Sequence, residues 1–511
     1  MKNIRLIGLI IFMACFGLFL SLGFIGKYEL SEAQFDKQIK AEHVALKERV
    51  EHMFGQEYGS NFAFIADFQE AFDAYNQDKR NAQLWNEVIY DNYVASLTKS
   101  ATKGLVKDYA GVLFGLIFIG GTIGALMFLI PKAKLDGPAG IKHNGIFKDP
   151  LNNRGWLGIL IGTVLIVFYI TIYFYDQYMT NWVILVEPLK QLLVPGGEAS
   201  QWFLYGFLYT FGVLVMGVRM IIKYRHSKYQ IVRTVSVMFF QTAIAFILPE
   251  ILVRLNQPYF DFKNMWPLDY DFFDAWHVDM LTAEGGGVGI FMFVWGITLF
   301  VIGVPVFVYL FGKRWYCSWV CGCGGLAETV GDPFRQLSDK SVKAWKIERY
   351  LIHAVLVFAV VMTAGVIYNF ITGTNQILGL DTYKYLRQPY GFYVGALFSG
   401  VIGTGFYPFM GNRVWCRFGC PLAAYLGLVQ RFKSRFRITT NGGQCISCGN
   451  CSTYCEQGID VRWYAQRGQN IVRSSCVGCG VCSSVCPRGV LNLENADEKG
   501  RFELNGFVKV D

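Results

Sequence analysis

The stretch of sequence that decides the fold lies toward the C-terminal end of the chain. It reads CISCGNCSTYC over residues 445–455 and CVGCGVCSSVCP over residues 476–487. In each half, three cysteines separated by two residues are followed by a fourth after three more residues. Three thiols at this spacing fit within one tight loop, whereas the fourth is placed to reach across to the other loop. The two halves therefore predict two adjacent metal-binding loops that exchange one ligand each.

This is the spacing of a bacterial two-cluster ferredoxin, and it occurs twice. We predict two [4Fe-4S] clusters, the first held by Cys445, Cys448, Cys451 and Cys486, and the second by Cys476, Cys479, Cys482 and Cys455. Zinc sites and disulfides are weaker explanations, because structural zinc is usually bound by paired C-x2-C motifs and disulfides are disfavoured in a reducing cytoplasm. Glu456 departs from the pattern, since proline usually follows the fourth cysteine.

The rest of the chain is too apolar for an ordinary soluble protein. Of its 511 residues, 53% are hydrophobic and 17% are charged, whereas a soluble domain has roughly 25% charged residues. This composition excludes a disordered chain and a disulfide-stapled one. Basic loops of a membrane protein account for the net charge of +9, so we predict membrane lipid as a partner and no nucleic acid.

Eight apolar runs are each long enough to cross a bilayer as a helix of roughly 20 residues. They cover residues 6–26, 110–130, 156–175, 202–222, 234–253, 288–311, 351–371 and 391–411. The predicted fold is mainly α, a polytopic bundle of about eight transmembrane helices followed by a C-terminal α+β domain of the bacterial 2[4Fe-4S] ferredoxin type.

The loops between these runs alternate in their content of basic residues. Short loops on one side carry 15 Lys and Arg residues and those on the other side carry five. By the positive-inside rule, both termini and the ferredoxin domain are expected on the cytoplasmic side of a bacterial inner membrane. Arg219 and Arg233 lie near the ends of two spans, and we expect their side chains to extend to the cytoplasmic interface.

These patterns predict six segments along the chain. They are a transmembrane anchor (1–26), a periplasmic helical cap (27–109), membrane helices 2–5 with an acidic periplasmic loop (110–287), membrane helices 6–8 with two C-x3-C motifs (288–435), the ferredoxin domain (436–495) and a C-terminal tail (496–511). The cap is expected to be helical because its apolar residues recur at near-helical spacing.

The two C-x3-C motifs belong to an internal repeat. Residues 312–321 read GKRWYCSWVC and residues 411–420 read GNRVWCRFGC. Cysteines four apart on a helix lie near one face, and both pairs follow a span that runs from outside to inside. We therefore predict that Cys317, Cys321, Cys416 and Cys420 converge at a four-thiolate metal or redox site. A third cluster, a copper site and a plain packing role all remain open, and Cys323 is a spare thiol.

With these motifs, the chain resembles the membrane polyferredoxins of the NapH, NosR and CcoG type. In that family, paired C-x3-C motifs after transmembrane helices precede a cytoplasmic two-cluster ferredoxin domain, and the resemblance covers roughly residues 288–495. It implies electron transfer between a quinol or cytoplasmic donor and a membrane or periplasmic redox enzyme or its maturation system.

The alternative function is a metal-handling assembly factor that binds and reduces copper for a terminal oxidase or a copper reductase, because soft thiolates suit Cu(I). The expected partners are a redox protein in the membrane or periplasm and, as an open alternative, quinol. No residue is predicted to act as a catalytic acid or base, because outer-sphere electron transfer only requires positioned cofactors.

Overall fold

The computed structural model describes residues 2–141, 143–377 and 379–496. The predicted C-terminal tail, 496–511, lies outside the described residues apart from Ala496. The chain divides into two compact units: unit 1 contains residues 1–131 and 170–208, and unit 2 contains residues 132–169 and 209–511. The cysteine motifs of the ferredoxin domain and of the internal repeat all belong to unit 2.

Seven helices among the described residues are long and apolar enough to cross a membrane. They are Lys2–Ser21, Ala110–Asp136, Trp156–Phe174, Gln201–Lys223, Lys228–Arg254, Gly286–Phe311 and Val342–Thr372. Large apolar side chains such as Ile290, Val301 and Val357 point outward from them, which suits a lipid environment. The mainly helical membrane fold and seven of the eight predicted spans are thus confirmed.

The eighth predicted span, 391–411, is wrong in its extent. The helix here is continuous from residue 382 to Ile402, so it begins and ends earlier than predicted, and its last 13 residues form the π-helix η12 (Tyr390–Ile402). A turn then covers residues 403–406 before the short helix α20 (Tyr407–Met410) begins. Glycine destabilises a helix interior, and Gly400, Gly403 and Gly405 are spaced through this end of the segment.

In unit 1, the predicted cap segment forms a small helical body with its own core. It contains β1 (Lys27–Tyr28), α2 (Glu32–Gln38), η1 (Ala41–Leu46), α3 (Lys47–Val50), η2 (Glu51–Met53), α4 (Asn61–Asn81), η3 (Trp85–Glu87), α5 (Val94–Ala101), β2 (Thr102–Lys103) and α6 (Leu105–Asp108). Strands β1 and β2 pair antiparallel and close the segment. Phe35, Leu46, Phe64 and Phe68 are fully buried in its core. Unit 1 also contains α1 (Lys2–Ser21), α7 (Ala110–Phe114), η4 (Gly115–Gly120), η6 (Asp176–Met179) and α10 (Thr180–Leu193).

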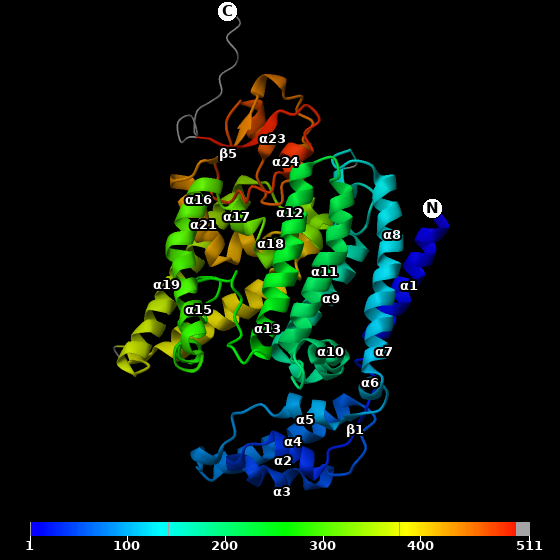
Figure 1. Ribbon diagram of the computed structural model, residues 1–511, viewed down its shortest axis with the longest axis vertical. Helices are drawn as coiled ribbons and strands as arrows, with labels where there is room; N and C mark the ends of the chain where they lie inside the picture. The colour runs from blue at the N-terminus through cyan, green and yellow to red at the C-terminus, as the bar shows by residue number, and fades with distance from the viewer. Residues whose placement is uncertain (1, 142, 378, 497–511) are drawn as a thin grey trace, which may run out of the picture. The chain divides into compact units, whose positions relative to one another are not determined.

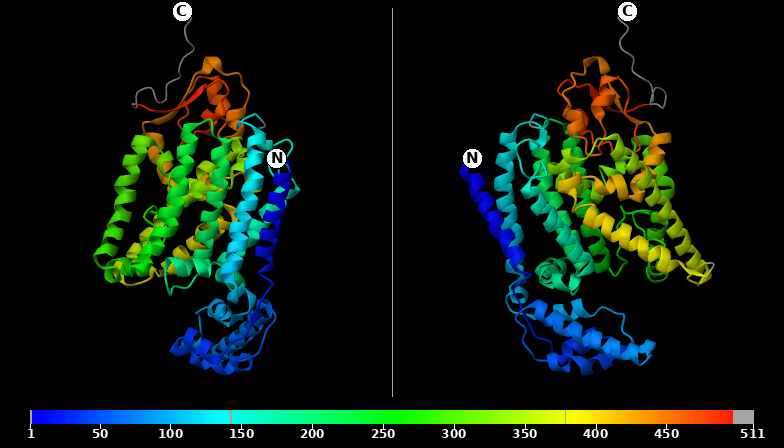
Figure 2. Two further views of the ribbon diagram at one scale, coloured as in Figure 1. Left: turned by 45° about the vertical axis from the view of Figure 1, so that its right-hand side comes forward. Right: turned by 180° about the vertical axis from the view of Figure 1, so that it is seen from behind.

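The long helices of unit 2 lie side by side, with the ferredoxin domain at one end (Figures 1 and 2). Its longer helical runs are α12–η7–α13 (Lys228–Arg254), α15–η9–α16 (Gly286–Phe311) and α19 (Val342–Thr372). The helices α8 (Gly121–Asp136), α9 (Trp156–Phe174) and α11 (Gln201–Lys223) contribute to both units. Shorter elements include η5 (His143–Gly145), α14 (Ala275–Asp279), η8 (Met280–Glu284), α17 (Arg314–Cys317), α18 (Gly322–Thr329), η10 (Asp332–Leu337), β3 (Gln376–Ile377), β4 (Leu380–Asp381), η11 (Tyr383–Arg387), η13 (Trp415–Gly419) and α21 (Pro421–Phe432).

The ferredoxin domain is closed by a two-stranded antiparallel sheet that joins its beginning to its end. Strand β5 (Phe436–Thr440) pairs with β6 (Leu491–Asn495), with Phe436 opposite Asn495. Between the strands lie η14 (Gly442–Gln444), α22 (Asn450–Thr453), α23 (Val461–Gln466) and α24 (Val481–Ser484). Pairing the two ends of the domain brings the two cysteine motifs together around one core.

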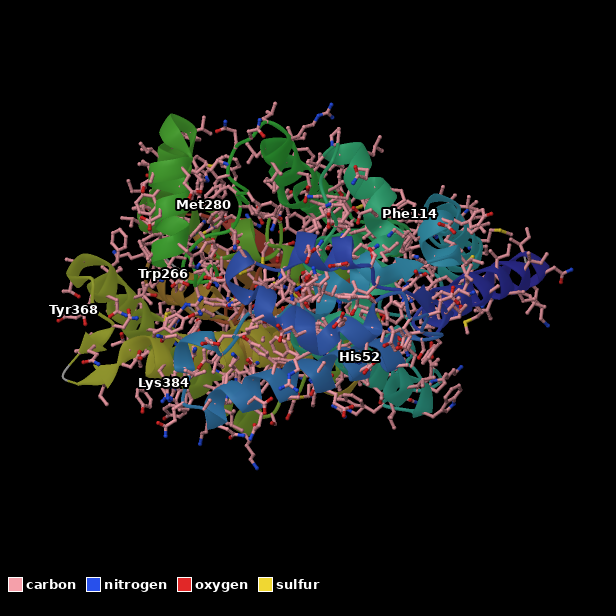
Figure 3. All side chains as sticks on the ribbon, turned by 90° about the horizontal axis from the view of Figure 1, so that it is seen from below. His52, Phe114, Trp266, Met280, Tyr368 and Lys384 are labelled. Atoms are coloured by element: carbon pink, nitrogen blue, oxygen red, sulfur yellow. The ribbon has the colours of Figure 1, made fainter. Side chains whose placement is uncertain are left out.

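The segment between α13 and α15, residues 255–285, folds back into the bundle of unit 2. Both helical runs meet the ferredoxin domain at their other ends, so this segment starts and finishes at the far end, where Met280 and Lys384 lie (Figure 3). Nevertheless the hydroxyl of Tyr316 donates a hydrogen bond to the carbonyl of Lys263 at 2.8 Å. Met265 is fully buried in the core that contains the C-x3-C cysteines. We call residues 258–274 the re-entrant segment.

Candidate metal centres

The first cavity is lined by Cys445, Cys448, Cys451 and Cys486. These are the four cysteines predicted for the first cluster, and the structure brings them together in a space of about 350 Å³ that is open at one side. Cys448 is exposed and Cys451 is buried. The loop before α22 turns through Gly449, whose φ of +79° favours glycine.

The second cavity is lined by Cys455, Cys476, Cys479 and Cys482, in a space of about 380 Å³. This is the set predicted for the second cluster, including the exchanged ligand from the other motif. A side chain at Gly478 would place its Cβ 2.7 Å from that of Arg314, so the loop can pack here only with glycine. Cys476 and Cys482 are buried, and the cavity is less exposed than the first.

The C-x3-C cysteines form a third group, which we call the bundle thiol cluster: Cys317, Cys321, Cys323, Cys416 and Cys420. All except the partly buried Cys323 are 5–8% exposed. They pack in one core, and the Cys420 thiol interacts electrostatically with Cys416, Cys317 and Cys321. The structure therefore brings together the four predicted residues, and it adds Cys323, which packs against the same core.

The local geometry of each C-x3-C pair differs from the predicted single helix. Cys317 ends α17, whereas Cys321 is the N-cap of α18 with extended backbone angles. In the second repeat, Cys416 lies in η13 and Cys420 caps α21, where its sulfur accepts from the Ala423 amide at 3.3 Å. The chain breaks the helix between the two cysteines in both copies. Each pair thus converges through a corner rather than along one helix face.

Hydrogen bonds from the helical bundle hold the second cavity against the bundle thiol cluster. Ser318, next to Cys317, donates to the carbonyl of Val477 at 2.8 Å. Gln430 of α21 donates to the carbonyl of Cys476 at 2.9 Å, and Gln230 of α12 donates to that of Cys479 at 2.8 Å. Val477 and Cys479 also pack into the core of the bundle thiol cluster. The three thiol groups therefore lie in a row in space: the first cavity, the second cavity and the bundle thiol cluster.

A network of buried and half-buried charges surrounds this junction, and no sequence motif indicated most of it. Its cations are Arg219, Lys223, Arg233, Arg335 and Arg413, and its carboxylates are Glu328, Asp332 and Glu456. Arg233 is fully buried and pairs with Glu328, while Arg219 pairs with Asp332 at 2.8 Å. The expectation that Arg233 extends to the interface was wrong, because the buried Glu328 offers it a stronger partner. The same expectation for Arg219, whose side chain is 19% exposed, stays a prediction.

Glu456 and Arg413 connect the second cavity to the bundle thiol cluster. Arg413 is 3.6 Å from the sulfur of Cys416 through Nη1 and 2.9 Å from Glu456 through Nη2. Burial alone would raise the pKa of Glu456, but Arg335, Arg413 and Arg233 lower it to about 2. The residue that stands in place of the usual proline is therefore a buried anion beside the ligand candidate Cys455.

The thiol groups fit an anionic metal cluster better than a set of free thiols. Burial raises the pKa of Cys451 and of Cys479 to about 12, so these thiols ionise at neutral pH only beside a metal cation. The charged network has five cations against three carboxylates. A four-thiolate iron–sulfur cluster is anionic and would offset that excess of positive charge.

Two known families match this chain, and both bind iron–sulfur clusters. The family described as "4Fe-4S dicluster domain" matches residues 437–487, which hold all eight cysteines of the two cavities. The family described as "4Fe-4S binding domain" matches twice, over residues 291–341 and 392–439. Each of these matches contains one C-x3-C pair. The prediction of [4Fe-4S]-binding domains is confirmed, and the number of clusters stays a prediction.

Similar proteins carry the same kind of description. The chain is 28% identical over 168 residues to a protein named "Putative electron transport protein YccM" of Escherichia coli, covering 30% of this chain and 45% of that protein. It is 26% identical over 162 residues to the "Methylamine utilization ferredoxin-type protein MauN" of Methylobacillus flagellatus, covering 30% and 52%. MauN of Paracoccus denitrificans is 28% identical over 163 residues, with the same coverage.

The chain thus spans about half the length of the curated relatives it matches. No solved structure matches it. The two [4Fe-4S] families, the ferredoxin-type relatives and the seven membrane-length helices together fit a membrane polyferredoxin.

Proposed function

We propose that this protein relays single electrons from a quinol or cytoplasmic donor to a membrane or periplasmic redox enzyme or its maturation system. The observation that carries this proposal is the graded burial of the three thiol groups. The first cavity includes the exposed Cys448, the second is less exposed, and the bundle thiol cluster lies inside the helices. Bound iron–sulfur clusters would supply one-electron transfer at these positions.

The contacts of the bundle thiol cluster support a path into the membrane. On one side it touches the loop of the second cavity through Ser318 and Val477. On the other side, Tyr316 bonds to the re-entrant segment, which comes from the far end of the bundle. The cluster therefore has protein contacts toward both ends of unit 2, as a relay between a donor on one side and an acceptor on the other requires. The names of the relatives, electron transport and ferredoxin-type, agree with this role.

The loops that meet the ferredoxin domain are those with many basic residues. Tyr454 of the domain accepts hydrogen bonds from the amides of Gly140 and Asn144 in the loop after α8. His226, in the loop after α11, bonds to the carbonyl of Ser484. By the positive-inside rule, this end of the protein would face the cytoplasm of a bacterial inner membrane. Electrons from the cytoplasm would then enter at the first cavity.

The experiment is electron delivery by the protein reconstituted in vesicles. A reductant outside reaches the ferredoxin domain, and the acceptors are a quinone dissolved in the bilayer and cytochrome c trapped in the lumen. We expect the wild type to reduce at least one acceptor, and Cys317→Ser/Cys416→Ser to lose this delivery while the iron of the two cavities is retained. Equal delivery by the double variant, or none by the wild type, would contradict the relay.

Copper handling is the second candidate, and the five thiols of the bundle thiol cluster are what favours it. Thiolates are soft ligands that suit Cu(I), and the spare Cys323 lies among them. If the double variant keeps electron delivery but no longer binds Cu(I) that the wild type binds stoichiometrically, the bundle thiol cluster handles copper instead.

A further inference from the structure

The exposed side of the first cavity combines apolar and basic side chains. Cys448 is exposed there, and Ile446 and Trp463 are 57% and 43% exposed. Arg462 and Arg488 line the mouth of the cavity. Arg467 stacks on the Trp463 ring, with its guanidinium carbon 4.0 Å from the ring centroid. An apolar centre with a charged rim is the usual make-up of a protein–protein interface.

Negative charge is scarce on this side of the domain. Residues 436–495 contain five arginines and three carboxylates, and none of the three lines the first cavity. Glu456 is fully buried, Asp460 accepts a hydrogen bond from Ser452, and Glu494 accepts one from Thr439. Asp460 remains charged at the start of α23, so the face around the first cavity sets Arg462, Arg467 and Arg488 against one nearby carboxylate. Its net charge is therefore positive, and it favours an anionic partner.

The position of this face favours a protein over a lipid surface. Helix α23 carries Arg462 and Trp463, and it lies in the part of the domain away from the membrane helices (Figure 1). Its Gln466 side chain donates a hydrogen bond to the Ser447 hydroxyl of the same domain at 2.6 Å. The second cavity, by contrast, is held by residues of the helical bundle, Gln230 of α12 among them. A lipid headgroup layer would meet the helix ends, whereas a soluble protein can reach the first cavity.

We propose that Ile446, Cys448, Arg462, Trp463, Arg467 and Arg488 form the docking face for a small soluble electron carrier whose own redox centre is ringed by carboxylates. This inference rests on the proposed electron relay and names the chemical class of its donor. One electron leaves the reduced carrier and enters this protein at the first cavity, and no bond forms or breaks. Opposite charges on the two faces would speed encounter, and the apolar centre would bring the two redox centres close.

The test uses the full-length holoprotein in nanodiscs of neutral phosphatidylcholine, with a flavodoxin, a small acidic flavoprotein, as the probe. Binding of oxidised flavodoxin and the rate of electron transfer from its reduced form are measured at several salt concentrations. Arg462→Glu/Arg488→Glu is expected to slow association about 10- to 100-fold at low salt, with little difference at about 0.5 M salt, where charges are screened within a few ångströms. Rates are divided by the iron content of each variant.

A matched control reverses two charges elsewhere. Lys343 and Lys346 are exposed at the start of α19 and line neither cavity, so Lys343→Glu/Lys346→Glu should bind flavodoxin as the wild type does. Trp463 and Arg467 lie outside the lining of the first cavity. Trp463→Ala/Arg467→Glu should therefore weaken flavodoxin binding even if Arg462→Glu/Arg488→Glu loses iron. If both face variants bind flavodoxin more weakly and the control binds it as the wild type does, the docking face is established.

Other outcomes would overturn it. If Lys343→Glu/Lys346→Glu weakens flavodoxin binding as much as the face variants do, flavodoxin responds only to the net charge of the protein. Suppose instead that the face variants bind flavodoxin as the wild type does, but no longer respond to anionic phosphatidylglycerol as the wild type responds. The face would then bind lipid. Because binding of oxidised flavodoxin needs no electron transfer, it decides on the docking face even if electron delivery into the bundle fails and the relay itself is wrong.

Discussion

At the scale of single residues, Glu456 links two of the three thiol groups by its charge. It is fully buried and pairs with Arg335 at 2.8 Å and with Arg413 at 2.9 Å. Arg413 in turn contacts the sulfur of Cys416. A carboxylate at this position therefore sets how much positive charge both the second cavity and the bundle thiol cluster experience.

Glu456→Gln should destabilise the protein and raise the reduction potentials of both sites. Removing one partner of a buried ion pair costs about 3–5 kcal/mol of unfolding free energy. Without the carboxylate, the positive charge of the two arginines is no longer offset, and it would favour the reduced, more anionic state of a cluster. Denaturant unfolding and EPR-monitored redox titration measure the two effects. Glu494→Gln is the control, since Glu494 is on the partly exposed strand β6. Unchanged potentials in Glu456→Gln would mean that the charge is not sensed at the metal sites.

Asp332 gives a stability prediction with a defined pH dependence. It is fully buried between Arg219, Lys223 and Arg335. Burial would raise the pKa of its carboxyl, but these cations hold that pKa far below its ordinary range. Its contribution to stability is therefore complete above the ordinary carboxyl pKa of about 4 and is lost only as pH falls toward the lower folded-state value.

Asp332→Asn should thus cost about 3–5 kcal/mol of unfolding free energy, and the loss should be constant between pH 7 and about pH 5. Thermal unfolding of wild type and variant across this range measures it. A difference that shrinks as pH falls from 7 to 5 would show that the carboxyl already takes up a proton there, contrary to the buried geometry.

At the scale of elements, local patterns predicted the parts of the fold whose residues are close in sequence. The spacing within 445–455 and 476–487 was enough to predict which cysteines share each cavity, because the geometry of one cluster determines that spacing. Apolar runs of membrane length likewise predicted seven helices. The repeat predicted which C-x3-C thiols meet, but not that each pair turns a corner between two helices.

Partners from distant elements could not be predicted in this way. Arg233, Glu328, Arg413 and Glu456 come from α12, α18, the loop before η13 and the loop after Cys455, and no sequence spacing connects them. Residues 255–285 had the polar, acidic composition of a loop outside the membrane. Only its contacts, such as that between Lys263 and Tyr316, show that part of it enters the bundle.

The re-entrant segment places an ion pair beside the bundle thiol cluster. Lys263 Nζ is 3.1 Å from Asp261 Oδ2, and a Cβ on Gly322, next to Cys321, would be 3.6 Å from Lys263 Nζ. Opposite changes are expected from the two partners. Lys263→Met should lower the reduction potential of a metal centre at this cluster, and Asp261→Asn should raise it, while the ferredoxin clusters stay unchanged. Redox titrations of both variants that shift in the same direction would contradict this electrostatic role.

At the scale of the whole molecule, the three thiol groups make a prediction about metal content. If the bundle thiol cluster holds an iron–sulfur cluster, as the two "4Fe-4S binding domain" matches support, the anaerobically purified protein should contain about 12 irons and as many sulfides per chain. Cys416→Ser should reduce this to about eight irons. About eight irons in the wild type with stoichiometric copper would favour the copper-handling function instead.

The order in which iron leaves the protein tests the same arrangement independently of electron transfer. Under a chelator with an oxidant, loss should begin at the first cavity, where Cys448 is exposed, and continue at the second. The bundle thiol cluster should lose its metal last, because its four repeat cysteines are 5–8% exposed and surrounded by apolar side chains. EPR spectra recorded during chelation distinguish the sites when compared with spectra of the single-site cysteine variants. Simultaneous loss at all three sites would mean that the helices do not shield the bundle thiol cluster, and that electrons could reach it without passing through the ferredoxin domain.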